Sequence, residues 1–147
     1  MKIYEIQPAS NSTLFLIVPI VVLLLFIVLF LFYAFISSKT AKFIINDGVL
    51  EIKATLYSTK MPINDLKRNE IKIINLLEDK SWSLKWRLNG IGLIGYSEGW
   101  FRLNNKEKAL AFVTNQKEVV LIPTIKDYYL LVSPKNPNEF VRELKAE

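Results

Sequence analysis

The sequence of 147 residues contains no cysteine and no histidine. Without a thiol or an imidazole, the chain cannot form a thiolate nucleophile, a Ser/His/Asp triad, a Cys/His zinc site, a disulfide framework or an attached haem. We therefore expect no cofactor and no metal. The lack of cysteine is compatible with either side of a membrane, so it leaves the redox compartment open.

Glycine is also scarce, and four of the five glycines lie between residues 90 and 99. Gly90, Gly92 and Gly95 match the pattern G-x-G-x-x-G, which in a dinucleotide site opens a helix within a parallel βαβ unit. Here Tyr96 and another β-type run follow, so the context does not support a cofactor site. The cluster instead predicts a wide turn or bulge at the rim of a sheet, or a loop that contacts a partner.

Charge is missing from a long stretch near the N-terminus, between Glu5 and Lys39. The run from Leu14 to Ile36 is hydrophobic throughout except for Pro19, which lies in its second turn, where a proline costs a helix least. As a helix this run would be roughly 34 Å long, slightly more than the hydrocarbon core of a bilayer. We predict a retained transmembrane helix. The alternative is a cleaved signal peptide, whose apolar region is normally shorter.

The basic residues that flank this run predict its orientation. Lys2 precedes it, whereas Lys39, Lys42 and Lys53 follow it. Because basic residues favour the cytoplasmic side, we expect a single-pass protein of the cell membrane with a cytoplasmic tail, residues 37–147. The expected parts are a head (1–13), the transmembrane helix (14–36), a short linker (37–41) and one small domain (42–147).

The tail reads as short strands separated by turns, with alternating apolar residues. Asn46-Asp47-Gly48 predicts a tight hairpin after the run 43–45, and further runs of β type continue to Ser133. Seven or eight short antiparallel strands are expected. A helix should then begin at Pro137, with Asn136 as its N-cap, and its apolar face should consist of Pro137, Phe140, Val141 and Leu144.

This pattern resembles the pleckstrin-homology (PH) superfold, and in particular bacterial PH domains that follow N-terminal membrane helices. The resemblance covers residues 42–144 and is carried by Arg87-Leu88-Asn89-Gly90, Gly99-Trp100-Phe101, residues 120–124 and 129–133, and Ser133-Pro134 before the helix. It implies a mainly-β domain that a C-terminal helix covers. Members often carry two membrane helices, so their hairpin-anchored topology does not transfer to this chain.

All three tryptophans lie between residues 82 and 100. By strand phase, Trp82 and Trp86 should share a buried face with Leu84 and Leu88. Phe101 and Leu103 should point inward, which would turn Trp100 outward. We therefore expect a partner to contact the rim that comprises Asn89, Gly90, Gly92, Gly95, Gly99, Trp100 and Arg102.

Lysine and arginine outnumber aspartate and glutamate by five, and Lys2 and Glu5 cancel in the head, so the tail carries the whole surplus. Such a surplus favours an anionic surface. However, the signs are interspersed, and the basic cluster that PH domains use for phosphoinositides is missing around Asn46-Asp47-Gly48, so we expect no specific headgroup site. No basic stripe interleaves with aromatic residues as nucleic-acid binding would require.

Carboxylates such as Glu78, Asp79 and Glu98 could in principle form an acid/base pair, but no nucleophile, base and orienting group recur together. We therefore expect a non-catalytic module that presents a PH-like domain near the bilayer and binds a protein partner or a second copy of itself. The alternatives that stay open are a sensor of anionic lipid and a small membrane-bound enzyme.

Overall fold

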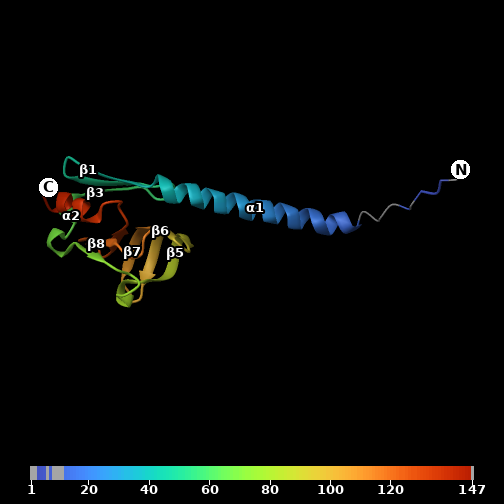
Figure 1. Cartoon of the computed structure of the whole chain (residues 1–147). Helices are drawn as coiled ribbons and strands as arrows, with labels where there is room; N and C mark the ends of the chain where they lie inside the picture. The colour runs from blue at the N-terminus through green and yellow to red at the C-terminus, as the bar shows by residue number, and fades with distance from the viewer. Residues whose placement is uncertain (1–2, 6, 8–11, 147) are drawn as a thin grey trace. The chain divides into compact units, whose positions relative to one another are not determined.

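The computed structural model describes residues 3–5, 7 and 12–146, so the expected head falls largely outside the described residues. The chain forms two compact units, Met1–Ile36 and Ser37–Glu147. Within the described residues there are two α-helices and nine strands (Figure 1).

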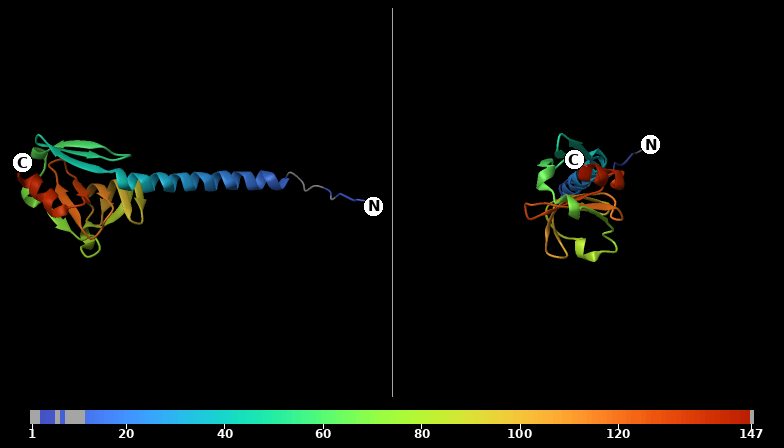
Figure 2. Two further views of the ribbon diagram at one scale, coloured as in Figure 1. Left: turned by 45° about the horizontal axis from the view of Figure 1, so that its top comes forward. Right: turned by 90° about the vertical axis from the view of Figure 1, so that its left-hand side faces the viewer.

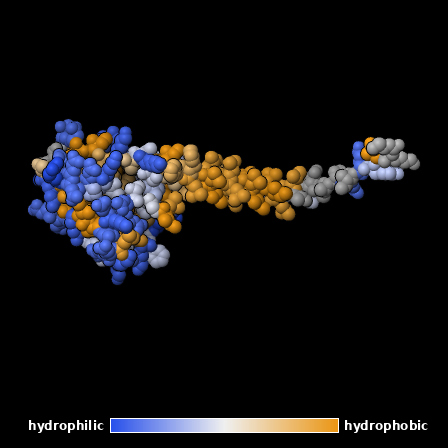
Figure 3. Space-filling model, in the orientation of Figure 1, coloured by the Kyte–Doolittle hydropathy of each residue, from blue (hydrophilic) through white to orange (hydrophobic). Residues whose placement is uncertain are grey.

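Helix α1 comprises Ser12–Thr40 and contains Pro19. The candidate membrane span Leu14–Thr40 contains an 18-residue window with a mean hydropathy of 3.5, and Figure 3 shows a continuous hydrophobic surface along the visible face of the helix. The helix is long and apolar enough to cross a membrane. Ser37–Thr40, which fall in the expected short linker, are helical, and Ser37 belongs to the second unit.

The second unit begins with a three-stranded sheet in the order β1-β2-β3, formed by Lys42–Asn46, Val49–Lys53 and Thr59–Pro62. Asp47 and Gly48 join the first two strands with φ angles of 50° and 70°, the left-handed pair that a tight hairpin requires. Asn46 pairs with Val49 across this turn. The hairpin predicted from Asn46-Asp47-Gly48 is confirmed.

The remaining strands form a six-stranded sheet in the order β4-β8-β9-β7-β6-β5. These strands are β4 (Lys72–Ile74), β5 (Leu84–Leu93), β6 (Tyr96–Leu103), β7 (Lys108–Val113), β8 (Val119–Pro123) and β9 (Tyr129–Val132). Short 3-10 helices lie at Ile63–Asp65, Arg68–Glu70 and Lys80–Trp82. The mainly-β fold class is confirmed. One pair departs from the expected antiparallel pattern, because β7 and β9 are parallel.

The central strands of the six-stranded sheet, β7, β8 and β9, are buried on both faces. Along β7, Leu110 and Phe112 pack into a first core with residues of the three-stranded sheet, while Ala109, Ala111 and Val113 pack into a second core on the other face. Figure 2 shows that the three-stranded sheet and the C-terminal helix lie on the same side of the six-stranded sheet. The runs of fully buried residues in β7 and β8 follow from this double burial.

Helix α2 comprises Pro137–Ala146. Phe140 and Leu144 are buried in the first core and Val141 packs against it, which confirms the predicted apolar face. The amide of Asn136 donates to Glu139 Oε2 over 3.0 Å, and the carbonyl of Asn136 accepts from Phe140 N–H over 3.0 Å. The helix therefore begins where its N-cap was predicted.

The predicted buried face of β5 is wrong. Trp86 is 64% exposed and Leu88 is 49% exposed, whereas Trp82 is half-buried beside Tyr129. The register with β6 shifts twice, between Leu84 and Trp86 and between Arg87 and Asn89. Each shift is a bulge that inserts one residue and reverses the side-chain phase, so Trp86 does not follow Leu84 into the core.

Candidate interaction surfaces

A groove of about 830 Å³ lies between strand β1, helix α2 and the ends of β7 and β9. Its apolar floor includes Phe43 of β1 and Phe140 of α2, whose ring centroids lie 5.8 Å apart at an angle of 57°. Both aromatic rings also contact the first core. The floor is therefore held by the same packing that holds the helix on the sheet.

Charges of both signs form the rim of this groove. The basic residues are Lys39, Lys42 and Lys135, and the acidic residues are Glu118, Glu139 and Glu143. All six side chains are exposed. An apolar floor with charges of both signs around it suits a peptide better than a single anionic headgroup.

Strand β1 is the edge of its sheet and lines the groove with open backbone. Across a two-residue hairpin the closing pair, Asn46 and Val49, is hydrogen-bonded, and such pairs alternate along an antiparallel ladder. Ile44 therefore bonds to β2, whereas Phe43 and Ile45 direct their N–H and C=O groups toward the open edge. The register of β1 and β2 contains no shift, so this edge is regular.

The rim predicted from the sequence lies on the hairpin of β5 and β6. Asn89, Gly92, Gly95 and Arg102 are exposed, Gly90 and Trp100 are half-buried, and Gly99 is buried. The structure thus brings these residues onto one hairpin but does not expose all of them. Strand β5 is also an edge strand, but its two bulges interrupt the row of backbone groups that another strand would need.

Trp100 is not turned fully outward. Its ring packs against Tyr128 at 5.0 Å between centroids, against the first core, and under the ammonium of Lys108 at 4.2 Å. Phe101 and Leu103 point into the second core, as their phase predicted. Arg102 is exposed and donates to the carbonyl of Lys106 over 2.9 Å.

Gly90 and Gly99 face each other across the hairpin and produce a sharp bend. Their φ angles are 125° and 121°, and a Cβ on Gly90 would lie 2.1 Å from the carbonyl oxygen of Glu98. A side chain at either position would overlap backbone, so these two glycines are required. The bend brings Gly92 close to the base of the strand, because its Cβ would lie 3.8 Å from Cδ of Arg87, much less than the ~16 Å that a straight strand gives for five residues.

Sequence reasoning missed the role of Glu98, which is fully buried. One carboxylate oxygen accepts from Leu56 N–H and Tyr57 N–H, both over 2.9 Å. The other oxygen accepts from Ser37 Oγ over 3.0 Å and from the hydroxyl of Tyr96. These four bonds occupy the carboxylate with structural contacts, which leaves it poorly placed to take a proton from a substrate.

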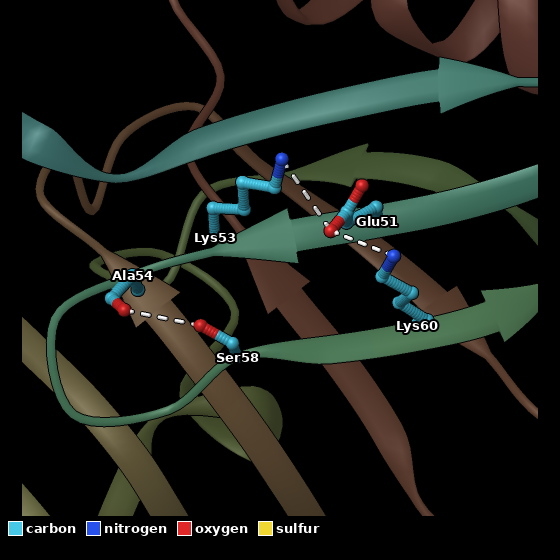
Figure 4. A network of polar contacts seen from close by, with 5 residues as sticks. All are labelled: Glu51, Lys53, Ala54, Ser58 and Lys60. Atoms are coloured by element: carbon cyan, nitrogen blue, oxygen red, sulfur yellow. Dashed lines mark hydrogen bonds and ion pairs between the residues drawn. The ribbon is translucent and has the colours of Figure 1, made fainter.

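A separate ion-pair network lies on the three-stranded sheet, where Glu51 contacts Lys60 at 3.2 Å and Lys53 at 3.6 Å (Figure 4). Next to it, Ser58 Oγ donates to the carbonyl of Ala54 over 3.2 Å. Partial desolvation alone would raise the pKa of Glu51, but hydrogen bonds and charge from Lys60 and Lys53 outweigh it, so the pKa of Glu51 lies below its ordinary value of 4.5. These are surface ion pairs between and along the strands of the sheet, and they do not form a reactive site.

Comparisons with known proteins identify the family to which the domain belongs. No curated protein and no solved structure matches the chain. A family model described as "Bacterial PH domain" matches residues 41–147, which is the greater part of the chain and contains the nine strands and α2. The N-terminal apolar helix that precedes this match is consistent with membrane anchoring. The chain belongs to the bacterial PH domain family.

Proposed function

We propose that this chain is a single-pass membrane protein whose PH domain binds a protein partner without catalysing a reaction. The groove between β1 and α2 is the observation that carries this proposal. It combines a regular strand edge, an apolar floor and a charged rim, which are the parts needed to hold an extended segment of another protein.

In the proposed complex, the partner segment adds a strand to β1. Its backbone bonds to the open N–H and C=O groups of Phe43 and Ile45, and its apolar side chains rest on the floor beside Phe140. The charges of the rim fix its direction, because a basic residue on the partner would meet Glu139 and an acidic one would meet Lys42 or Lys135.

Because of the membrane helix, even a low affinity of the groove for its partner would be sufficient for binding. Residues 14–36 confine the domain to the plane of a membrane, which raises its concentration near other membrane components above the value in solution. The groove also lies near the start of the domain, because Lys39 and Ala41 line it. A partner segment close to the bilayer surface would therefore be within reach.

Crosslinking in native membranes tests the proposal. A photoreactive amino acid at Lys135, an exposed position on the rim, should form an adduct with a partner protein in the intact chain. A second change, Thr114→Trp, places a large ring at an exposed position of the same groove and should abolish this adduct.

The matched control is Asn138→Trp, which adds the same ring at an exposed position of α2 that does not line the groove, and the adduct should persist. An adduct at the molecular mass of two chains would identify the partner as a second copy. A protein adduct that survives Thr114→Trp would contradict the groove, and adducts with lipid instead of protein would favour the lipid-sensing alternative.

A further inference from the structure

The hairpin of β5 and β6 ends in an exposed apolar turn. Its tip, residues 93–96, carries Leu93 and Ile94, of which Ile94 is fully exposed and Leu93 is 36% exposed. Gly95 closes the turn with a φ of 78° and has open space around it. No part of the domain covers this pair of aliphatic side chains, and exposing them to water costs free energy.

Hydrogen bonds to Glu98 join the tip to the residue that follows the apolar run, because Tyr96 and Ser37 both donate to the same carboxylate oxygen. Tyr96 pairs with Leu93 across the hairpin, and its hydroxyl lies 2.7 Å from Ser37 Oγ. Ser37, which is also bonded to Glu98, comes directly after Ile36 in the chain. A bilayer that holds the run as far as Ile36 therefore has its surface within a few ångströms of Ser37, and the tip lies beside that residue.

The composition around the tip suits the boundary between headgroups and acyl chains. The exposed Arg87 lies along the tip, with its Cδ 3.8 Å from the position of a Cβ on Gly92. Such an arginine can rest its methylenes on apolar surface while its guanidinium meets lipid phosphate. Tyr96 is buried with its hydroxyl against Ser37, which leaves the two aliphatic side chains as the exposed apolar groups of the tip.

We propose that the tip is a second membrane contact, in which Leu93 and Ile94 enter the interface of the bilayer that holds the apolar helix. This inference rests on the proposed membrane span. A protein partner at the tip is the competing occupant, but two aliphatic side chains offer it little area, and the contact of Tyr96 with Ser37 keeps the tip next to the end of the apolar run.

The test uses the full chain in vesicles of zwitterionic and anionic lipid, without other proteins. Because the sequence has no cysteine, Ile94→Cys carries an environment-sensitive fluorophore at one site. Lipids with a spin label near the headgroup should quench this probe strongly, and aqueous iodide should quench it weakly. Glu107→Cys, exposed in the turn at the other end of β6, should show the opposite pattern.

A third variant, Leu24→Cys, reports on the helix and should be protected from iodide and quenched by a spin label deep in the acyl chains. If the probe at residue 24 is in lipid but the probe at residue 94 is quenched by iodide as fully as the one at residue 107, the tip contact is wrong while the membrane span stands. If the probe at residue 24 is exposed to iodide, both the span and the tip contact are wrong. Neither result depends on the groove.

Discussion

At the scale of single residues, Glu98 has the largest structural role that the sequence did not reveal. Its four donors come from Ser37, Leu56, Tyr57 and Tyr96, three of which lie 41 to 61 residues away in the chain. A carboxylate between Ser97 and Gly99 has no local pattern that distinguishes it from a solvated loop residue. Long-range bonds of this kind become visible only when the fold is known.

We predict that Glu98→Ala destabilises the domain by about 2 kcal/mol or more, because it removes a buried carboxylate and leaves the partly buried N–H groups of Leu56 and Tyr57 without their acceptor. Glu98→Gln keeps one carbonyl oxygen and should cost less. Urea denaturation of the intact chain in detergent, followed by tryptophan fluorescence, measures both. Equal stability of the alanine variant and the unchanged protein would show that water satisfies these donors.

Trp86 and Trp82 give a second comparison. Trp86→Ala should change the free energy of unfolding by less than about 0.5 kcal/mol, since its side chain is mostly exposed. Trp82→Ala should cost more than about 1 kcal/mol, because its ring packs edge-on against Tyr129 at 4.9 Å and against the second core. The same denaturation experiment ranks the two variants, and the reverse order would restore the strand phase predicted from the sequence.

At the scale of elements, the regular parts of the chain were predictable and the irregular parts were not. The first hairpin and α2 follow from local signals, namely Asn46-Asp47-Gly48 and Asn136-Pro137. The alternation after Trp82 suggested one straight strand, but two bulges in β5 reverse the phase twice. A bulge depends on the partner strand, so the sequence of β5 by itself cannot show it.

The bend in the second hairpin predicts a contrast between neighbouring glycines. Gly90→Ala should destabilise the domain by at least about 2 kcal/mol, because it combines a left-handed φ with overlap on backbone. Gly92→Ala, two residues along the same strand, meets only side-chain atoms, the Phe101 ring at 3.4 Å and Arg87 Cδ at 3.8 Å, and should be tolerated. Thermal unfolding of the two variants tests this, and equal melting temperatures would mean that the bend relaxes freely.

The ion pairs on the three-stranded sheet predict a pH dependence. Because the pKa of Glu51 in the folded state lies below the ordinary value of 4.5, its contribution to stability is present above that value and is lost as the pH falls through the folded pKa. Glu51→Gln should therefore lose less stability than the unchanged chain on acidification below 4.5. Denaturation midpoints of both proteins, measured across this pH range, test the prediction. If the two plots of midpoint against pH are parallel, the ion pairs contribute nothing to stability.

At the scale of the whole molecule, the division into an apolar helix and one small domain follows from composition, whereas the PH family was indicated by the resemblance of the strands and the last helix and is shown by the family match. The groove that we propose as the partner surface was harder to predict. The glycine and tryptophan cluster drew attention to β5 and β6, whereas the groove is assembled from β1, α2 and the ends of β7 and β9. Residues so widely separated carry no common motif, and only the pairing of strands brings them together.

Membrane topology is the prediction at this scale. In intact cells, an impermeant maleimide should label Ile3→Cys and leave Glu107→Cys unlabelled, and both should react after the membrane is opened. The two positions lie on opposite sides of the apolar run, so each controls for the other. Labelling of residue 107 in intact cells would reverse the orientation, and loss of the first segment from the mature chain would identify it as a signal peptide.

The two bulges of β5 have a consequence for crowding in a membrane. Copies anchored as we propose would be held at one height, so open strand edges would meet side by side far more often than in solution, and regular edges would fuse into a growing sheet. In β5 the extra residues Lys85 and Leu88 interrupt the row of backbone N–H and C=O groups along the strand edge, and Lys85 adds a positive charge there. The regular edge of β1 instead lines the groove, beside the charged side chains of its rim. Copies of the chain could therefore be densely packed in a membrane without joining at β5, while β1 still pairs with its partner segment.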